Sequence, residues 1–208
     1  MNDYMQYGCG LSSPEGWLNF DASPTLRLQR IPLFGSILGK RVSHKMDYPI
    51  FPAGVKVGNI VDGLPIKEES CQGIYCSHIL EHLSLNEFRI ALRNSYLYLK
   101  PGGLFRAVMP DLAFLIHQYI EAESDSASYQ FMRSSYLGIE KRERGIIGLL
   151  TALMGNSKHL WMWDYPALKS ELETAGFIEI RRAKFNDSAN ERFLEVEEVG
   201  RWEGCLGI

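Results

Sequence analysis

The sequence predicts an α/β protein with a mostly parallel sheet, and three neighbouring segments carry this prediction. Gly73 to Cys76 is a short apolar run of strand length, and residues 85–99 follow it with apolar side chains at helical spacing. Residues 100–103, Lys-Pro-Gly-Gly, end that helix, and Leu104 to Met109 is a second short apolar run. The order strand, turn, helix, turn, strand is the unit of a parallel sheet, whose carboxyl edge holds ligands.

Three earlier strands are expected, and each ends at glycines or at an aspartate. They are Tyr4 to Tyr7 before Gly8-Cys9-Gly10, Trp17 to Phe20 before Asp21, and Val55 to Val61 before Asp62. Only eleven positions separate Gly10 from Asp21, so the helix between the first two strands is expected to be missing or reduced to a turn. A nicotinamide or flavin domain places its acidic residue about 20 residues on, which counts against that class.

The rest of the chain is expected to complete one domain, residues 1–208. A helical insertion at about 111–163 is expected to act as a lid, because it is far longer than an ordinary connection of about 2–6 residues. A helix is expected from Asp164 or Tyr165 to Gly176. Phe177 to Phe185 and Arg192 to Val199 alternate polar and apolar residues, which predicts an antiparallel hairpin at the sheet edge.

Composition narrows the class of protein further. The 208 residues are 46% hydrophobic and 23% charged, with a net charge of −3, which gives no electrostatic argument for nucleic acid or an anionic membrane. The four cysteines lack CxxC spacing and are expected to be reduced thiols of a cytoplasmic protein. We expect no signal peptide and no membrane span, because the first residues lack a basic and apolar leader pattern and no apolar run reaches roughly 20 residues.

Three motifs together give the chain a specific resemblance. They are Leu-Glu-His-Leu at 80–83, Leu-Lys-Pro-Gly-Gly at 99–103 and Pro-Asp-Leu at 110–112. With them the sequence resembles the class I S-adenosylmethionine-dependent methyltransferases. The resemblance implies a Rossmann-like seven-stranded sheet, mostly parallel, with helices on both faces and an antiparallel last strand. It also implies S-adenosylmethionine as cofactor and S-adenosylhomocysteine as product.

The predicted strand ends supply the candidate cofactor residues. A glycine pair lets the backbone approach a ligand closely, and a carboxylate at a strand end can accept both hydroxyls of a ribose. The resemblance assigns the ribose to Asp21, the adenine to Asp62 and the backbone at Gly63 and Leu64, and the methionine half to the edge of strand four. The candidate set is Gly8, Cys9, Gly10, Asp21, Asp62, Gly63, Leu64, Ser77 and His78.

The segment from His78 to His82 also matches H-x-x-E-H, a zinc-protease pattern. Histidines at i and i+4 of a helix share a face and can bind one metal ion. His78, however, directly follows a predicted strand, and no third ligand is evident. We therefore expect no metal site here and expect Glu81 and His82 to bond the first helical turn and the neighbouring loop.

Methyl transfer is an in-line displacement at an activated carbon, and the protein mainly has to align the acceptor. A hydroxyl or amine acceptor also needs a base, for which His78, His159 and Asp111 are the candidates, although Asp111 could instead cap a helix. The predicted function is methyl transfer to a small-molecule acceptor, such as a sugar or glycan precursor. A binding module without catalysis and a zinc hydrolase are the alternatives, the first because the third glycine of the family's first motif is replaced by Ser13. The insertion could also form a homodimer contact through the apolar run at 146–154.

Overall fold

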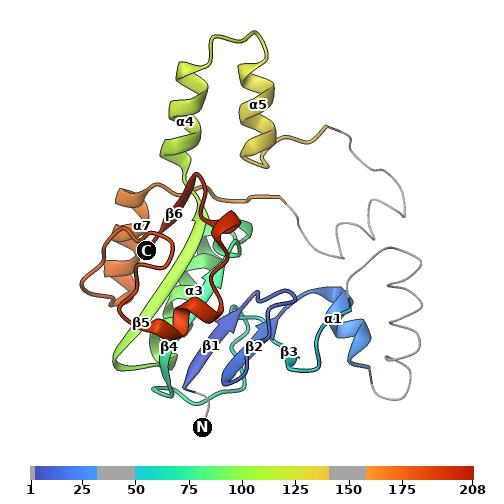
Figure 1. The fold of residues 1–208 in the computed structure, drawn as a ribbon, viewed down its shortest axis with the longest axis vertical. Coiled ribbons are helices and arrows are strands. Elements are labelled where there is room, and N and C mark those ends of the chain that lie inside the picture. The colour runs from blue at the N-terminus through green and yellow to red at the C-terminus, as the bar shows by residue number, and fades with distance from the viewer. Residues whose placement is uncertain (1–2, 32–49, 141–157) are drawn as a thin grey trace.

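A single six-stranded sheet organises the residues that the computed structural model describes, which are 3–31, 50–140 and 158–208 (Figure 1). The strand order is β3-β2-β1-β4-β5-β6; the first five strands are parallel, and β6 runs antiparallel to β5. The strands are β1 (Tyr4–Tyr7), β2 (Trp17–Asp21), β3 (Val55–Val57), β4 (Cys71–Ser77), β5 (Leu99–Pro110) and β6 (Cys205–Gly207). The predicted fold class is confirmed, with six strands in the described residues in place of the seven expected.

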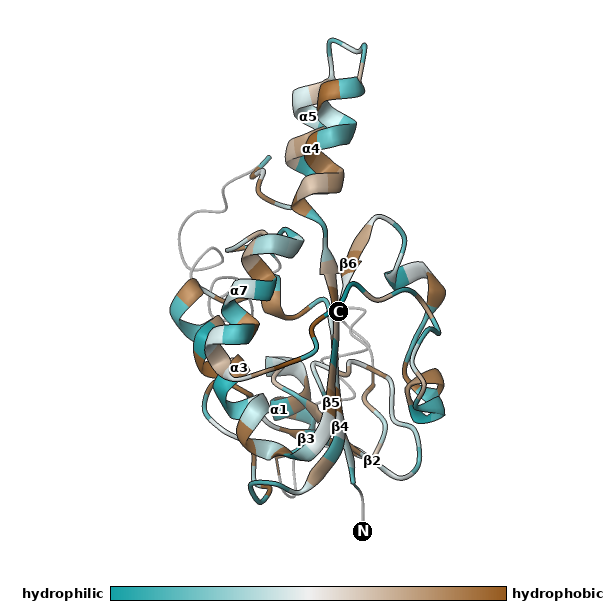
Figure 2. Ribbon diagram, turned by 90° about the vertical axis from the view of Figure 1, so that its left-hand side faces the viewer, coloured by the Kyte–Doolittle hydropathy of each residue, from teal (hydrophilic) through white to brown (hydrophobic). Residues whose placement is uncertain are grey.

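Helices cover one face of the sheet, and a segment with short 3-10 helices covers the other (Figure 2). The α-helices are α1 (Pro24–Gln29), α3 (Leu85–Tyr98), α4 (Leu112–Glu121), α5 (Ala127–Ser134) and α7 (Tyr165–Ala175). The 3-10 helices are η1 (Leu80–His82), η2 (Glu191–Glu195) and η3 (Val199–Arg201). No described helix is long and apolar enough to cross a membrane.

Alternation along β4 divides the core into two clusters. Side chains of successive strand residues point to opposite faces. Ile74 accordingly packs in the main cluster beneath α3 and α7, with Phe88 and Leu168, and all three are fully buried. Tyr75 packs on the other face against Phe193 of η2. Both faces of the central strand are therefore covered, as a parallel sheet requires.

Local signals in the sequence set the ends of the two long helices beside the sheet. Ser84 and Glu87 form a capping box at the start of α3, with reciprocal side-chain to backbone hydrogen bonds. Asp164 caps α7 by accepting the Ala167 N–H at 2.9 Å, and Gly176 follows its last residue. The predicted bounds of α7 are confirmed. Helix α3 ends at Tyr98, before the Lys-Pro-Gly-Gly segment, as predicted. The segment itself lies within the long strand β5, where it interrupts the pairing with β4 between Leu99 and Leu104.

The predicted hairpin over 177–185 and 192–199 is wrong. The first half is reduced to one isolated antiparallel bridge between Ala183 and Gly207, and the second half contains the 3-10 helix η2. Phe193 and Val196 are three residues apart and are both buried in one cluster. Helical spacing, and not the expected alternation, therefore places both side chains in the core. The antiparallel last strand is instead Cys205–Gly207.

The third strand also differs, because β3 ends at Val57 and not beside Asp62. Asn59 closes a turn there: its side-chain oxygen accepts the Val61 N–H at 3.0 Å, and Asn59 bridges to Gly63. An asparagine that offers the backbone a local hydrogen bond competes with strand pairing, which explains the early end.

The insertion forms a helical hairpin in its described part. Helices α4 and α5 leave the carboxyl end of β5 and stand away from the sheet (Figure 1). The predicted apolar run at 146–154 lies outside the described residues. A helical pattern was expected from Asp111 to about His159; in the described part it consists of two helices, separated by residues 122–126.

Candidate functional site

The turn after β1 forms one half of the site and agrees with the sequence-based prediction. Gly8 and Gly10 have φ angles of +63° and +54°, a region that glycine adopts without steric cost. A Cβ atom on Gly10 would meet no heavy atom within 4 Å, so the backbone there faces open space. A Cβ atom on Gly8 would instead lie 2.0 Å from Cδ1 of Ile79. The turn is thus open to a ligand at Gly10 and closed by packing at Gly8. No helix lies between β1 and β2, as expected.

Cys9 lies between these glycines but has no role as a nucleophile. Its N–H donates to the Phe20 carbonyl at 3.1 Å, which ties the turn to β2. Burial, and then the neighbouring Asp21 carboxylate, raise the pKa of the Cys9 thiol to about 12. The thiol therefore stays protonated at neutral pH.

Asp21 ends β2 and lies directly against the glycine turn. It is only 8% exposed, and its two carboxylate oxygens accept the N–H groups of Gly10 at 2.9 Å and Ser23 at 2.8 Å. Each oxygen keeps a further lone pair, so the anchored carboxylate can still accept ligand hydroxyls. The residues present therefore fit the ribose of S-adenosylmethionine: an immobilised carboxylate beside an open glycine backbone.

The Asp62 to Leu64 segment departs from the expected adenine site. Asp62 is exposed and accepts a hydrogen bond from the Asn59 amide at 3.1 Å. The Leu64 N–H, which the resemblance gave to the adenine, donates to the Tyr98 hydroxyl at 2.7 Å. The Leu64 side chain is 6% exposed and belongs to the main core cluster. Gly63, between Asp62 and Leu64, lies in the turn that bridges to Asn59.

Ser77 and His78 leave β4 at the centre of the carboxyl edge. Ser77 is buried on the Tyr75 face of the sheet. His78 has a φ angle of +54°, which is unusual for a non-glycine residue and marks a constrained position. Its Nε2 lies 2.9 Å from the Arg201 carbonyl oxygen, and its Nδ1 lies 3.2 Å from Oε1 of Glu81. The constrained backbone at His78 and these two contacts fix its ring between the C-terminal segment and η1.

His159 and His82 approach the same glutamate from other directions. His159 Nε2 is 3.9 Å from Glu81 Oε1, and the His82 and His159 rings are 4.9 Å apart, edge to face. His82 Nδ1 lies 2.9 Å from the Lys158 carbonyl oxygen. The Glu81 carbonyl accepts N–H groups from residues 160 and 161, so the loop that carries His159 is held against η1. Three histidines and one glutamate therefore meet at this point, although 77 residues separate His82 from His159 in the chain.

The two histidine candidates differ in protonation. Burial lowers the pKa of His78, but hydrogen bonds to Cys205, Glu81 and a backbone carbonyl outweigh it and raise the pKa to about 10. Burial lowers the pKa of His159. His78 is therefore charged and His159 neutral at neutral pH.

Asp111, the third candidate base, has a structural role. Oδ1 accepts the Ala113 N–H at 2.9 Å as the N-cap of α4, and Oδ2 pairs with Arg182 at 3.0 Å. Its backbone also bridges to Trp163. The helix-cap alternative is confirmed, and Asp111 does not line the cavity beside the histidines.

A cavity of about 720 Å³ opens beside the histidines at the carboxyl edge of β4 and β5. Its walls come from η1, α4, the residues after α5 and the C-terminal segment. They are His78, Glu81, His82, Pro110, Phe114, Leu115, Gln118, Ser134, Tyr136, His159, Gly200, Glu203, Gly204 and Cys205. Sequence reasoning missed Gln118, Tyr136 and Glu203, because no local pattern distinguishes them from other exposed polar residues.

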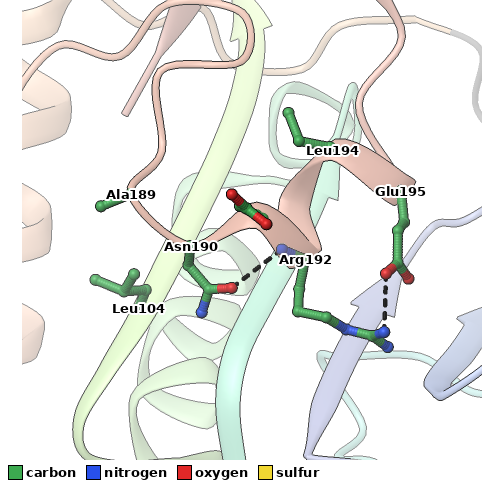
Figure 3. A pocket seen from close by; sticks show the side chains of 7 residues that line it. Leu104, Ala189, Asn190, Arg192, Leu194 and Glu195 are labelled. Carbon is green, nitrogen blue, oxygen red and sulfur yellow. Dashed lines mark hydrogen bonds and ion pairs between the residues drawn. The ribbon is translucent and has the colours of Figure 1, made fainter.

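A second hollow, of about 780 Å³, lies away from this edge (Figure 3). It is formed by η2 and by Leu104, near the amino ends of the parallel strands. Arg192 there is held by Asn190, which accepts its N–H at 3.1 Å, and by Glu195 at 2.8 Å. Ligands of parallel sheets bind at the carboxyl edge, so we assign this hollow no function.

Comparison with known proteins agrees with the fold. A family described as "Methyltransferase domain" matches residues 38–107, about a third of the chain. Residues 38–107 are therefore similar to a methyltransferase domain, which agrees with the methyltransferase activity and the S-adenosylmethionine cofactor expected from the sequence. No curated protein matches the sequence significantly.

This chain is also similar to solved structures of low sequence identity. A chain from the complex of the Haloferax volcanii Trm112 methyltransferase activator with a methyltransferase is 14% identical, with a TM-score of 0.50. The match covers 98% of the present chain and 79% of the chain from the Haloferax volcanii complex. An S-adenosylmethionine-dependent methyltransferase from Archaeoglobus fulgidus is 17% identical, with 91% and 66% of the two chains covered and a TM-score of 0.49.

Proposed function

We propose that this chain transfers the methyl group of S-adenosylmethionine to a small polar acceptor bound in the histidine-lined cavity. The observation that carries the proposal is the continuity of two features along one sheet edge. The open glycine turn with Asp21 lies at the ends of β1 and β2, and the cavity lies at the ends of the adjoining β4 and β5. A cofactor across the first pair of strands would present its methyl group toward the second pair.

The nature of the cavity wall supports a hydroxylated acceptor, such as a sugar or glycan precursor. Glutamate, histidine, glutamine, serine and tyrosine side chains supply both hydrogen-bond donors and acceptors there. His78 and His159, two of the three candidate catalytic residues, line it. We propose that both lie close to the acceptor, and that Asp111 acts only through the start of α4.

The helical hairpin supports a lid role for the insertion. Phe114, Leu115 and Gln118 of α4 and Tyr136 after α5 all line the cavity. These helices shape the acceptor side and have no part in the turn that holds Asp21. A homodimer contact through the insertion, or an activator protein like the one in the Haloferax volcanii complex, would use its exposed apolar side chains, such as Ile120 and Tyr129.

Calorimetry with S-adenosylmethionine and S-adenosylhomocysteine tests the cofactor half directly. Asp21→Ala should weaken S-adenosylhomocysteine binding by about tenfold or more, since a charged hydrogen-bond partner contributes about 1.5–3 kcal/mol. Asp62→Ala should have a smaller effect, because Asp62 is exposed and bonded only to Asn59. Asp125→Ala, on the exposed link between α4 and α5, is the control. Unchanged affinity in both Asp21→Ala and Asp62→Ala would contradict the cofactor site.

Gln118→Ala and Tyr136→Phe test the acceptor half. Both residues line the cavity, so both variants should lower methyl transfer to a screened set of sugars and leave S-adenosylhomocysteine affinity unchanged. A protein that binds the cofactor but methylates no acceptor in such a screen would favour the binding-module alternative, for which the replaced third glycine speaks.

A further inference from the structure

We propose that Glu81, His82 and His159 bind a divalent transition-metal ion of the Zn²⁺ type. One ligand atom from each of the three lies within 4.8 Å of those of the other two. No other group of three such residues occurs in the part of the chain that the structure describes. The sequence led us to expect no metal here, because His78 directly follows a strand and no third ligand was evident; the structure instead brings His159 beside His82.

Glu81 supplies the strongest argument for a cation. Its side chain is 1% exposed, and neither carboxylate oxygen has a protein hydrogen-bond partner. The groups around it are imidazoles: His78 Nδ1 at 3.2 Å, without hydrogen-bond alignment, and His159 Nε2 at 3.9 Å. No lysine or arginine among the described residues pairs with it. The His78 ring contacts only Oε1, and neither buried oxygen accepts a well-aligned hydrogen bond, which is costly; a bound cation would offset that cost.

His82 is already oriented as a metal ligand. Its Nδ1 lies 2.9 Å from the Lys158 carbonyl oxygen, which can only accept a hydrogen bond, so Nδ1 carries the proton. The lone pair of the neutral ring is then on Nε2. A histidine that binds metal through one nitrogen while donating from the other to a carbonyl is the usual arrangement at metal sites.

His159 is held against this pair from the opposite side. His159 is 7% exposed, and its ring contacts the His82 ring at 4.9 Å and the Tyr136 ring at 5.0 Å. The two residues that follow it, Leu160 and Trp161, are fixed to η1, because the Glu81 carbonyl accepts both of their N–H groups. The three ligand atoms would have to move closer together than their present spacing of up to 4.8 Å to lie about 2.0–2.2 Å from one ion.

The ligand set also indicates the kind of site. Two histidines and one glutamate leave a fourth tetrahedral position open, as in zinc sites that bind a substrate or water. All three residues line the 720 Å³ cavity, so the open position faces it. If the cavity binds the acceptor, which rests on the proposed function, the ion would hold an oxygen atom of that acceptor.

Titration with metal alone tests the site. The full-length protein is stripped with a chelator, and Co²⁺ binding is followed by visible absorption and Zn²⁺ binding by calorimetry. We expect one equivalent to bind. Glu81→Gln and His159→Ala should each lower the affinity by more than the about 10–100-fold lost when only a supporting partner of a ligand is removed. His117→Ala is the matched control, because His117 also pairs with a glutamate, Glu121, but is exposed on α4.

Wild-type protein alone already decides the question if a variant fails to fold. Zn²⁺ should raise its melting temperature, since a ligand that binds only the folded state stabilises it. Absence of stoichiometric Co²⁺ binding in the wild type overturns the proposal, as does equal binding in folded Glu81→Gln and His159→Ala. S-adenosylhomocysteine affinity, measured in the same samples, separates the two proposals: metal binding without cofactor binding would contradict the proposed function and leave this site standing.

Discussion

The two halves of the carboxyl edge are built in different ways. At β1 and β2 the site is made by backbone geometry: two glycines with positive φ angles and a carboxylate fixed by two backbone N–H groups. At β4 and β5 it is made by side chains that meet from η1, α4, the loop at His159 and the C-terminal segment. The first half belongs to 14 consecutive residues, 8–21, whereas the second spans residues 78–205. A cofactor site can be formed by residues that are close in the sequence, whereas an acceptor site here needs side chains from segments that are distant in the sequence.

The C-terminal segment is the part whose attachment most affects the second half. Arg106 on β5 is buried and bonds Glu197, whose side chain has no exposed surface, and also the Lys184 carbonyl at 2.6 Å. Removal of one partner of a buried ion pair costs about 3–5 kcal/mol where the other charge is left unpaired. Arg106 keeps Asp187 as a partner at 2.9 Å, so Glu197→Gln should lower the free energy of unfolding in urea titrations by less than that amount.

The matched control is Glu140→Gln, which removes one partner of the exposed pair with Arg133. Exposed pairs contribute about 0–1 kcal/mol, so this variant should unfold almost like the wild type. Equal losses in the two variants would show that burial does not determine the strength of the attachment, and that the C-terminal segment is held by other contacts.

Gly8 and Gly10 allow the first half to be divided between stability and binding. In Gly8→Ala the new Cβ would meet Ile79, and the left-handed backbone costs a further about 1–2 kcal/mol. With about 1–3 kcal/mol for overpacking, the expected loss of stability is about 3 kcal/mol. Gly10→Ala should lose only the backbone contribution to stability, since its Cβ meets nothing. Its loss of free energy of S-adenosylhomocysteine binding should be larger than its loss of free energy of unfolding.

The double variant Gly8→Ala/Ile79→Ala provides the check on this reasoning. It should recover the overpacking part of the loss if Ile79 is the obstacle. Chemical denaturation and calorimetry on the same samples report both quantities. If Gly10→Ala binds the cofactor like the wild type, the open space at Gly10 is not part of the cofactor site.

Asp187 makes the attachment of the C-terminal segment depend on pH. Burial opposes ionisation of its carboxyl group, but hydrogen bonds from Arg181, the Lys184 N–H and Arg106 outweigh it and lower the pKa from 3.8 to about 2. A lowered pKa contributes stability above the unfolded value, and this is lost as pH falls from about 3.8 toward 2. Asp187→Asn should cost about 2 kcal/mol at pH 7, and the difference from wild type should shrink below pH 4.

Urea titrations between pH 7 and pH 3 measure this difference. Asp125→Asn, at an exposed position between α4 and α5, should show no such pH-dependent change. A difference for Asp187→Asn that stays constant over this range would mean that the arginine contacts do not depend on the charge of residue 187.

The same contrast explains what could be predicted from the sequence. The strands that end at Gly8 and Asp21, the helix α3 and the bounds of α7 are all set by neighbouring residues, and all agree with the structure. Asp62 was misplaced, because the Asn59 side chain ends β3 early through a contact that strand patterns do not record.

Long-range packing could not be predicted in this way. The alternation at 192–199 suggested a strand, but burial of Phe193 and Val196 against Tyr75 selected a 3-10 helix. Nothing near Glu81 in the sequence indicates that His159 will lie beside it. The proposed metal site therefore depends on tertiary contacts, and the sequence pattern H-x-x-E-H pointed to the wrong histidine.

The smallest expected effect concerns the helix that supports the loop of His159. Asp164 begins α7 and accepts the Ala167 N–H at 2.9 Å, so Asp164→Ala should cost about 1 kcal/mol. Ser126 occupies the corresponding position of α5 but makes no cap hydrogen bond, so Ser126→Ala should cost only a few tenths of that. Thermal melting should show a shift of a few degrees for the first variant and almost none for the second.

Because Trp163 and Asp164 directly follow the loop, a loss of Co²⁺ affinity in Asp164→Ala alone would show that the acceptor half depends on this cap. Equal shifts in both variants would mean that the start of α7 is fixed by packing of Trp163 against Phe88, whose rings stack at 4.1 Å, and not by the cap.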